Sequence, residues 1–578
     1  MYTSTMAHFH TKTKKGRPYL YVREIARVNG KPTVVSQIYL GSPEKVAELA
    51  TRRSVGDIQL SVQEFGSLFL ANHMDSDVDF ASIVNSLVPA DPKEKGPSVG
   101  EYFLFGVLNR MVEAKSKRAL PEWYGTTAIQ SIRPVDVSAL TSERYWAKWD
   151  RVSPKQVEEI GKRFFARIWE IEKFSADCAL FDTTNYYTFM SSRTKSDLAK
   201  RGNNKEGRHN LRQVGLGLLV SRSQRLPLFY SVYPGSMHDS KLFDKIMDEM
   251  FGIVAGFQQT KERLTVVIDK GMNSEPNMAW LDEHPKVHFV TAYSPYFAEE
   301  LAATSLERFE PVETPKNLAL SRIDQDQDRL VAYRTTGEFW GKKRAVVVTY
   351  NPPTARKQEY VFDQKLEQIR TNLIDMRAKV RDKAPQWKDQ DSIRERYHRL
   401  CEYLHIDSGY YELSFETVEK RLTMSFRKNL YRTENKRKTL GRSIIITDNT
   451  DWTTQDIVQV HLDRCEIESG FRQSKDDDLV GVRPIRHWTD SKIRCHLLTC
   501  VVALTYLRQL ELRLQEKGIH RTACAVMEEM RHLHSVLLLE SGFRDPRRKL
   551  EQPSKTQAEV LQVLGYRIDK SGVLQTGE

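Results

Sequence analysis

Three acidic residues far apart in the chain could together hold a divalent metal ion. Asp182 follows the apolar run 178–181 (CALF), and Asp269 follows the apolar run 264–268 (LTVVI). Glu468 lies in a third stretch, which is strongly charged. Carboxylates held close together repel one another, and a divalent cation relieves that repulsion. Because oxygen ligands favour a hard ion, these residues predict a site for Mg²⁺ or Mn²⁺.

The stretch 461–475 (HLDRCEIESGFRQSK) sets one acid within a row of bases. A helix advances about 100° per residue, so five of its side chains fall within an arc of about 80° centred near Glu468. The five are His461, Arg464, Glu468, Arg472 and Lys475. Taken alone, such a helix is more often an exposed one with ion pairs between residues four apart. Glu466 is a competing acid, but it points about 160° away from Glu468.

The elements that must position these acids follow from the pattern between 177 and 293. The pattern predicts strands at 178–181, 214–220, 227–233, 264–269 and 287–293, with helices at 241–251 and from 274 onward. Short early connections favour an antiparallel meander, and the later helical connections favour parallel pairing. This order is typical of a ribonuclease H-like α/β core, a mixed five-stranded sheet with flanking helices.

In such a core the ends of the first and fourth strands lie side by side. Asp182 and Asp269 are therefore expected to be neighbours, although they are 87 positions apart. An aspartate at the end of a strand is by itself more often a turn residue or a helix cap. The expectation of a site depends on both aspartates and the charged helix occurring together.

With these residues in place, the chain resembles the DDE-type transposases of bacterial insertion sequences. It is most similar to the group whose last acid lies in Tyr-x2-Arg-x3-Glu-x6-Lys. Here the matching residues are Arg464, Glu468 and Lys475, whereas His461 replaces the tyrosine. The segment 234–243 (PGSMHDSKLF) also resembles the family. The resemblance implies that Asp182, Asp269 and Glu468 are the catalytic acids and bind two Mg²⁺ or Mn²⁺ ions.

A long segment separates the last two acids. Asp269 and Glu468 are 199 positions apart, so the core is interrupted before its last catalytic helix. The resemblance implies a β-rich insertion, whereas the pattern predicts strands at 343–350 and 443–448 and charged helices within 355–402, a mixed insertion. In related enzymes an aromatic residue of the insertion can receive a flipped base, and Trp340 is the candidate here.

Basic residues around the acids are candidates for contact with DNA phosphates. The run 427–442 has seven basic residues and one acid, although such a run is usually a solvated surface. His461 donates fully only when protonated, which predicts a stronger acid-side pH dependence than tyrosine would give. The candidate DNA-binding set is His461, Arg464, Arg472, Lys475, Arg208, Arg212, Lys436, Arg437 and Lys438.

The N-terminal residues predict a small β-structure. Two β-rich runs within 18–41 flank Asn29-Gly30, a strong hairpin signal. Lysines and an arginine precede it, so it is either a structural ribbon or an arm that contacts DNA, and the sequence leaves both open. The expected divisions are a hairpin module at 1–60, a helical DNA-binding or dimerisation region at 61–175, core halves at 176–300 and 451–515, an insertion at 301–450, and a helical tail at 516–578.

Composition agrees with a DNA-binding enzyme of the cytoplasm. The formal net charge is +12, which favours polyanionic partners. Six cysteines without a Cys-x2-Cys pair suit a reducing compartment. Neither a signal peptide nor a membrane span is predicted. We expect a bacterial, nucleoid-associated protein whose partners are transposon ends and target DNA, acting as a homodimer because two ends must be paired.

The expected function is that of a DNA transposase. It would bind the terminal inverted repeats of an insertion sequence, cleave DNA at the ends and join the 3′-OH to target DNA. Two alternatives remain open, a ribonuclease H-like nuclease without strand joining and a catalytically silent, transposase-derived DNA-binding protein.

Overall fold

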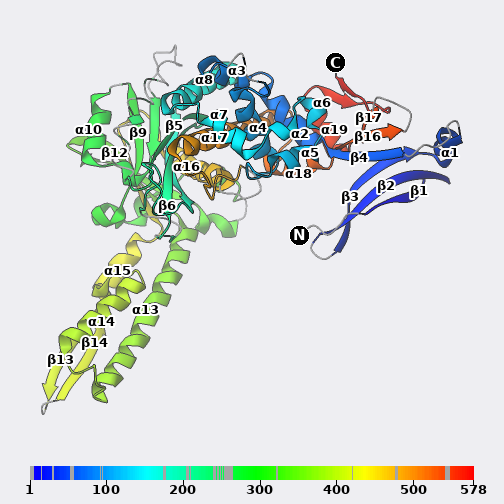
Figure 1. Cartoon of the computed structure of the whole chain (residues 1–578). Helices are drawn as coiled ribbons and strands as arrows, with labels where there is room; N and C mark the ends of the chain where they lie inside the picture. The colour runs from blue at the N-terminus through cyan, green and yellow to red at the C-terminus, as the bar shows by residue number, and fades with distance from the viewer. Residues whose placement is uncertain are drawn as a thin grey trace. The chain divides into compact units, whose positions relative to one another are not determined.

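The structure, a computed structural model, divides into two units (Figure 1). The first unit is Met1–Lys261 with Cys465–Glu578, and the second is Glu262–Arg464. The structure describes all residues except 1–5, 15, 29–30, 52–57, 91–92, 94, 174–177, 203–206, 209, 238–242, 244–245, 248, 250–251, 253–263, 285, 321–322, 419–420, 475–479, 541–546 and 578. It describes the backbone alone at 6, 27–28, 48–51, 58, 323–325, 465–474 and 539–540.

Six of the described strands of the second unit pair side by side in the order β10-β11-β12-β15-β9-β8. They are β8 (Leu264–Ile268), β9 (Val287–Tyr293), β10 (Glu310–Pro311), β11 (Val331–Phe339), β12 (Lys342–Tyr350) and β15 (Arg442–Thr447). β8 and β9 are parallel and are connected by α10 (Glu275–Glu283), whereas the other pairs are antiparallel. All five residues of β8 are buried, as its continuous apolar run predicts. The predicted strands and the predicted helix of this segment are confirmed.

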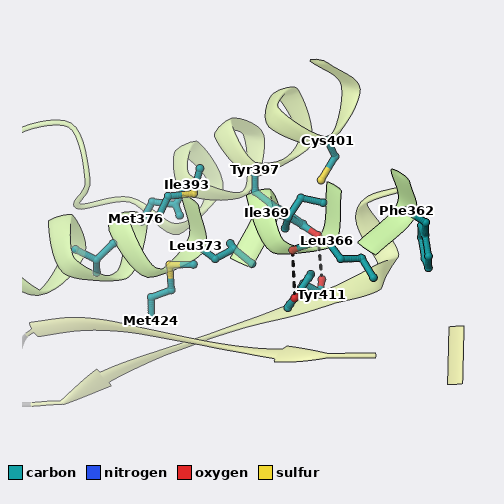
Figure 2. Close-up of a cluster of buried hydrophobic side chains, with 11 residues drawn as sticks. Phe362, Leu366, Ile369, Leu373, Met376, Ile393, Tyr397, Cys401, Tyr411 and Met424 are labelled. Carbon is teal, nitrogen blue, oxygen red and sulfur yellow. Dashed lines mark hydrogen bonds between the residues drawn. The ribbon is translucent and has the colours of Figure 1, made fainter. Parts of the chain in front are cut away.

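The insertion between β12 and β15 is a helical hairpin covered by a β-ribbon. Its elements, which we call the arm, are α13 (Pro352–Arg381), α14 (Gln390–Tyr403), β13 (Tyr411–Val418), β14 (Arg421–Lys428) and α15 (Leu430–Thr439). Figure 2 shows the core of the arm, where apolar side chains of both helices meet the ribbon. Strands and helices both occur within 301–450, as the pattern predicts, and each helix of the arm is longer than its strands.

The helix α16 (Thr454–Ser474) follows β15 and carries the signature. Its first turn is fixed by a reciprocal cap. The amide of Asp456 donates to Thr453 Oγ1 (3.1 Å), and the amide of Thr453 donates to Asp456 Oδ2 (3.2 Å). The residues up to Arg464 belong to the second unit, and those from Cys465 belong to the first.

The first unit holds an antiparallel meander of β5 (Cys178–Thr188), β6 (Arg212–Ser221) and β7 (Pro227–Pro234), as predicted. β5 does not end at Asp182 but continues for six residues, so the prediction that the strand ends there is wrong. Five of the six residues that follow (TTNYYT) are β-branched or aromatic, and Thr183, Thr184 and Tyr186 are buried. The helix predicted at 241–251 falls largely outside the described residues.

Helices make up much of the rest of the first unit, and the two predicted helical segments within 97–175 are confirmed. The helices are α2 (Gly66–Asp75), α3 (Phe80–Leu87), α4 (Val99–Val112), α5 (Leu120–Gly125), α6 (Ile129–Ile132), α7 (Ser142–Trp149), α8 (Pro154–Glu172), α17 (Asp490–Glu516), α18 (Ala523–Arg531) and α19 (Lys555–Val563). All but one residue of α4 are buried or nearly so, and α17 packs along it.

The N-terminal residues form a three-stranded antiparallel sheet. β1 (Met6–Lys14) joins the predicted hairpin of β2 (Arg17–Val28) and β3 (Lys31–Gly41), and α1 (Pro43–Thr51) follows. A second sheet has the order β17-β16-β4, from β4 (Ile58–Glu64), β16 (His534–Glu540) and β17 (Arg547–Leu550). With the pair β18 (Tyr566–Ile568) and β19 (Leu574–Thr576), the segment 516–578 therefore holds strands as well as the predicted helix.

Candidate active site and DNA-contacting residues

The second acid contacts the signature helix directly. Asp269 follows β8 at once, as predicted, and its carboxylate forms an ion pair with the Arg464 guanidinium of α16. The two residues are 195 positions apart, and both belong to the second unit. Their side chains are 30% and 20% exposed, so the pair is shielded but open to solvent at one side. The structure thus brings two sequence-predicted site residues together.

His461 lies one turn before Arg464 on the same helix. Burial, reinforced by the neighbouring positive charge of Arg464, lowers the pKa of His461 to about 4, although Asp269 opposes the shift. The imidazole is therefore neutral at pH 7. The expectation that His461 donates fully to a phosphate only when protonated stays a prediction, and the lowered pKa moves that protonation to more acidic pH.

Asp182 occupies an inner position of β5. It pairs with Leu218 of β6 and is half-buried between the buried Phe181 and Thr183. It belongs to the first unit, whereas Asp269 belongs to the second.

The third acid lies in the helix, but its side chain is outside the described atoms. The backbone of α16 is helical through Ser474, so Glu468 and Arg472 are helical, as predicted. Lys475 lies outside the described residues. A helix brings residues four apart onto one face, so Glu468 follows Arg464 on the same side of α16. Among residues with described side chains, no group of three His, Cys, Asp or Glu could hold a metal ion.

A fourth acid shows how unspecific a strand-end aspartate is. Asp448 also follows an apolar run, yet its carboxylate accepts the Phe289 amide (2.8 Å) and contacts the His288 ring (3.0 Å). It fastens the end of β15 to β9. Asp269, in contrast, faces a guanidinium, a group that a cation can displace from a carboxylate. The oxygen donors of Asp182 and Asp269 fit a hard divalent ion.

Of the candidate DNA-binding residues outside α16, some have exposed side chains and others form hydrogen bonds or ion pairs within the protein. Arg212 donates to the carbonyls of Ser192 (2.6 Å) and Thr194 (2.7 Å), so it fixes its own loop. Arg437 is ion-paired with Glu359 and with Asp363 (2.6 Å), which fastens α15 to α13.

The exposed members of this set lie elsewhere. Arg208 is exposed and lies over the Tyr187 ring (4.4 Å), and Lys436 and Lys438 of α15 are exposed. Trp340 lies at the β11–β12 turn with φ of 50°, and its ring is within 6.1 Å of the rings of three other aromatic residues, Phe289, Tyr293 and Phe339.

Sequence reasoning missed a buried arginine that positions the segment after α16. Arg110 of α4 is 7% exposed, and its guanidinium donates to the carbonyls of Gly481 (2.9 Å) and Val480 (3.3 Å). The Val480 amide donates back to the Arg110 carbonyl (2.8 Å). A single arginine in an apolar helix was the signal, since such a residue is rarely buried without a specific partner.

The segment that Arg110 holds also reaches the end of β5. Thr188 Oγ1 donates to the Ile485 carbonyl (2.7 Å), and the Ile485 amide donates to the Tyr187 carbonyl (3.2 Å). Within the first unit, the strand that carries Asp182 is therefore tied to the chain that leaves α16.

Comparison with protein families identifies residues 188–506 as a transposase DDE domain. The chain belongs to the DDE transposase family. The match contains Asp269 and Glu468, whereas Asp182 lies six residues before it. Metal-dependent cleavage and transfer of DNA strands is the activity of this enzyme family, and the transposase acts in DNA transposition.

The chain was also compared with curated proteins and with solved structures. No match was found among curated proteins. One solved structure, described as the cryo-EM structure of a piggyBac transposase synaptic complex with hairpin DNA, matches over 82% of each chain, with 10% identity and a TM-score of 0.38. At that distance, individual residues of the two chains cannot be equated. No helix among the described residues of the transposase is long and apolar enough to cross a membrane.

Proposed function

We propose that this transposase binds the terminal inverted repeats of an insertion sequence, cleaves the DNA at the ends and joins the freed 3′-OH to target DNA. Asp182, Asp269 and Glu468 are the proposed catalytic and metal-binding residues. The ion pair between Arg464 and Asp269 carries the proposal, because it joins the signature helix to the second acid.

The two halves of α16 are held by different parts of the chain, and each part carries one of the other acids. The N-terminal half meets Asp269 through Arg464 in the second unit. The segment that leaves the helix is fastened by Arg110 and by the end of β5, which carries Asp182, in the first unit. Glu468 lies between these two attachments.

The chemistry follows from the charges. Two Mg²⁺ or Mn²⁺ ions are the proposed cofactors, and when bound they supply activation of a water or 3′-hydroxyl and stabilise the leaving oxygen. Arg464 neutralises Asp269 in the free protein. It can then donate to a strand phosphate, since a guanidinium remains charged at any working pH. No protein nucleophile is needed, because in-line attack at phosphorus depends on positioning and charge.

The proposed DNA path uses exposed bases of the described residues together with the bases at the end of the signature. Lys436 and Lys438 of α15, Arg208 beside β6, and Arg472 and Lys475 at the end of the signature are proposed to contact phosphates. Arg212 and Arg437 are proposed to act indirectly. Arg212 holds its own loop in place, and Arg437 holds α15 against α13. A homodimer on DNA is proposed because transposition pairs two ends.

Substitution of the acids tests the proposal. Asp182→Asn, Asp269→Asn and Glu468→Gln should each abolish cleavage of an end-bearing duplex in Mg²⁺, while its affinity for that duplex in EDTA changes little. Each substitution removes one ion-binding charge and keeps the shape of the side chain. The matched control is Asp448→Asn, since the described partners of that strand-end carboxylate lie in β9, and the side-chain amide oxygen of asparagine can still accept the Phe289 N–H.

The products decide between the remaining functions. Joined products from pre-cut ends indicate a transposase of the proposed kind, and hydrolysis without joining indicates a nuclease. If any of the three variants keeps near-normal cleavage, that residue is not one of the catalytic acids. If the parent binds ends but cuts no DNA even in Mn²⁺, this copy is a silent binding protein.

A further inference from the structure

One face of the N-terminal sheet combines bases and tyrosines. Directly paired residues of neighbouring strands lie on the same face of a sheet. The register pairs His8 with Arg23, His10 with Tyr21, Lys12 with Tyr19 and Lys14 with Arg17, and it pairs Tyr21 with Tyr39 and Arg23 with Gln37. We call these residues the basic sheet face; they are His8, His10, Lys12, Lys14, Arg17, Tyr19, Tyr21, Arg23, Gln37 and Tyr39.

The opposite face of the sheet is the one that packs. Val22 and Ile38 are buried against Val536, with Leu40 and Val62 beside them. The sheet is therefore already anchored by its apolar side. The packing of the apolar face holds the sheet in place without a contribution from the basic sheet face.

The basic sheet face has a charge distribution that folding alone does not explain. The chain has no Asp or Glu before Glu24, and Glu24 pairs with Ala7 and Ser36, on the other face. Like charges directly opposite one another destabilise a sheet, yet Lys14 faces Arg17. A polyanion placed over this face would remove the repulsion.

The tyrosines give the face a second property. Tyr39 is 45% exposed, and its ring lies 5.2 Å from that of Tyr21 and 6.0 Å from that of Tyr19. Lys12 Nζ lies 5.2 Å from the centre of the Tyr21 ring. The rings are tilted relative to one another and cluster beside the bases, with hydroxyls able to donate to phosphate or base edges.

We propose that the basic sheet face is a docking surface for duplex DNA, separate from the catalytic region. Three strands about 4.8 Å apart span about 10 Å, which fits a major groove about 12 Å wide. Along β1, the alternate residues from His8 to Lys14 extend over about 20 Å, enough to follow several phosphates. This surface lies before residue 188, outside the residues that match the DDE domain. The inference rests on the proposed function only in that the ligand is DNA.

Binding of full-length protein to a labelled duplex in EDTA tests this surface, because no cleavage is needed. The variant Lys12→Gln/Lys14→Gln/Arg17→Gln should bind at least about 10-fold more weakly than the parent. The slope of log affinity against log salt should become less steep by about 2 to 3, since each lost phosphate contact accounts for about 0.9. Tyr39→Ser should weaken duplex binding as well.

The control removes the same charge elsewhere on the first unit. Lys155→Gln/Lys517→Gln/Lys570→Gln changes three exposed lysines and should keep the parent's salt slope. Equal losses in both variants would show only a general effect of net charge and overturn the surface. Selective loss of single-stranded DNA binding would overturn the duplex assignment. The binding assay does not measure catalysis, so a negative result would not affect the proposal for the three acids. Likewise, a negative result in the cleavage assay would not affect the proposal for the basic sheet face.

Discussion

At the residue scale, Asp269 and Arg464 show what the sequence could supply. The spacing of the signature and the apolar run before Asp269 were both visible in the chain, and the ion pair joins them. The spacing could not show that His461 is neutral, because its pKa depends on burial by residues distant in sequence. Nor could the sequence distinguish Asp448 from the proposed catalytic aspartates, since all of them follow apolar runs.

Lys117 is buried in a way that the local sequence does not predict. It is 5% exposed, and its Nζ has no hydrogen-bond partner among the described residues. The ammonium lies 5.1 Å from the centre of the Tyr145 ring and 5.2 Å from that of Trp149. Burial, with the nearby charge of Arg110, lowers the pKa of Lys117 to about 7.

Lys117→Met should therefore stabilise the protein most at low pH. Below pH 7 the folded protein holds a charged lysine in an apolar site, a cost that methionine removes. Between pH 7 and about 10.5 the folded lysine is neutral while the unfolded one still binds a proton, so the parent gains up to about 1.4 kcal/mol per pH unit. The advantage of the variant should shrink over that range.

Thermal unfolding midpoints of parent and variant between pH 6 and 9 measure this effect. The exposed Lys155→Met serves as the control and should show no such pH-dependent difference. A Lys117→Met variant that is less stable than the parent at pH 6.5 would show that the cation–π contacts outweigh the cost of burial.

At the element scale, local patterns predicted most strands and helices, and non-local partners were missed. The highly charged, helix-like pattern of residues 355–402 predicts helices where α13 and α14 lie. The predicted end of β5 at Asp182 is wrong, because the β-forming residues that follow continue the strand to Thr188. The pairing of β4 with β16 joins segments about 470 positions apart, as in Glu64 with His534, and no local signal marks such a partner.

The arm should unfold as an element of its own when its core is damaged. Leu373 of α13 is fully buried among the apolar side chains in Figure 2, whereas its neighbour Ile374 is 42% exposed. Leu373→Ala should cost about 2 to 5 kcal/mol in the arm. Hydrogen exchange should accelerate across 352–440 and change little in the six-stranded sheet.

Ile374→Ala is the matched control, since it removes a similar side chain from the same turn at little cost. Faster exchange throughout the second unit in Leu373→Ala would contradict an independent core for the arm. Equal effects of the two substitutions would contradict the burial on which the prediction depends.

At the scale of the whole molecule, charge and connectivity agree with an enzyme that holds DNA. The arm segment 352–440 has 20 Lys and Arg against 14 Asp and Glu, which is half of the net charge of the chain in 89 residues. The second unit is inserted between residues 261 and 465 of the first, and α16 runs from one unit into the other. The proposed metal site therefore draws its three acids from both units.

Metal-directed cleavage of the protein itself is the most direct test of the proposed metal site. With Fe²⁺ in place of Mg²⁺ and with peroxide, hydroxyl radicals cut the backbone beside a bound ion. We predict cuts near residues 182, 269 and 468 together, all suppressed by excess Mg²⁺ and all lost in Asp269→Asn. Cuts near only one of the three acids, or cuts that persist in that variant, would contradict a single site formed by Asp182, Asp269 and Glu468.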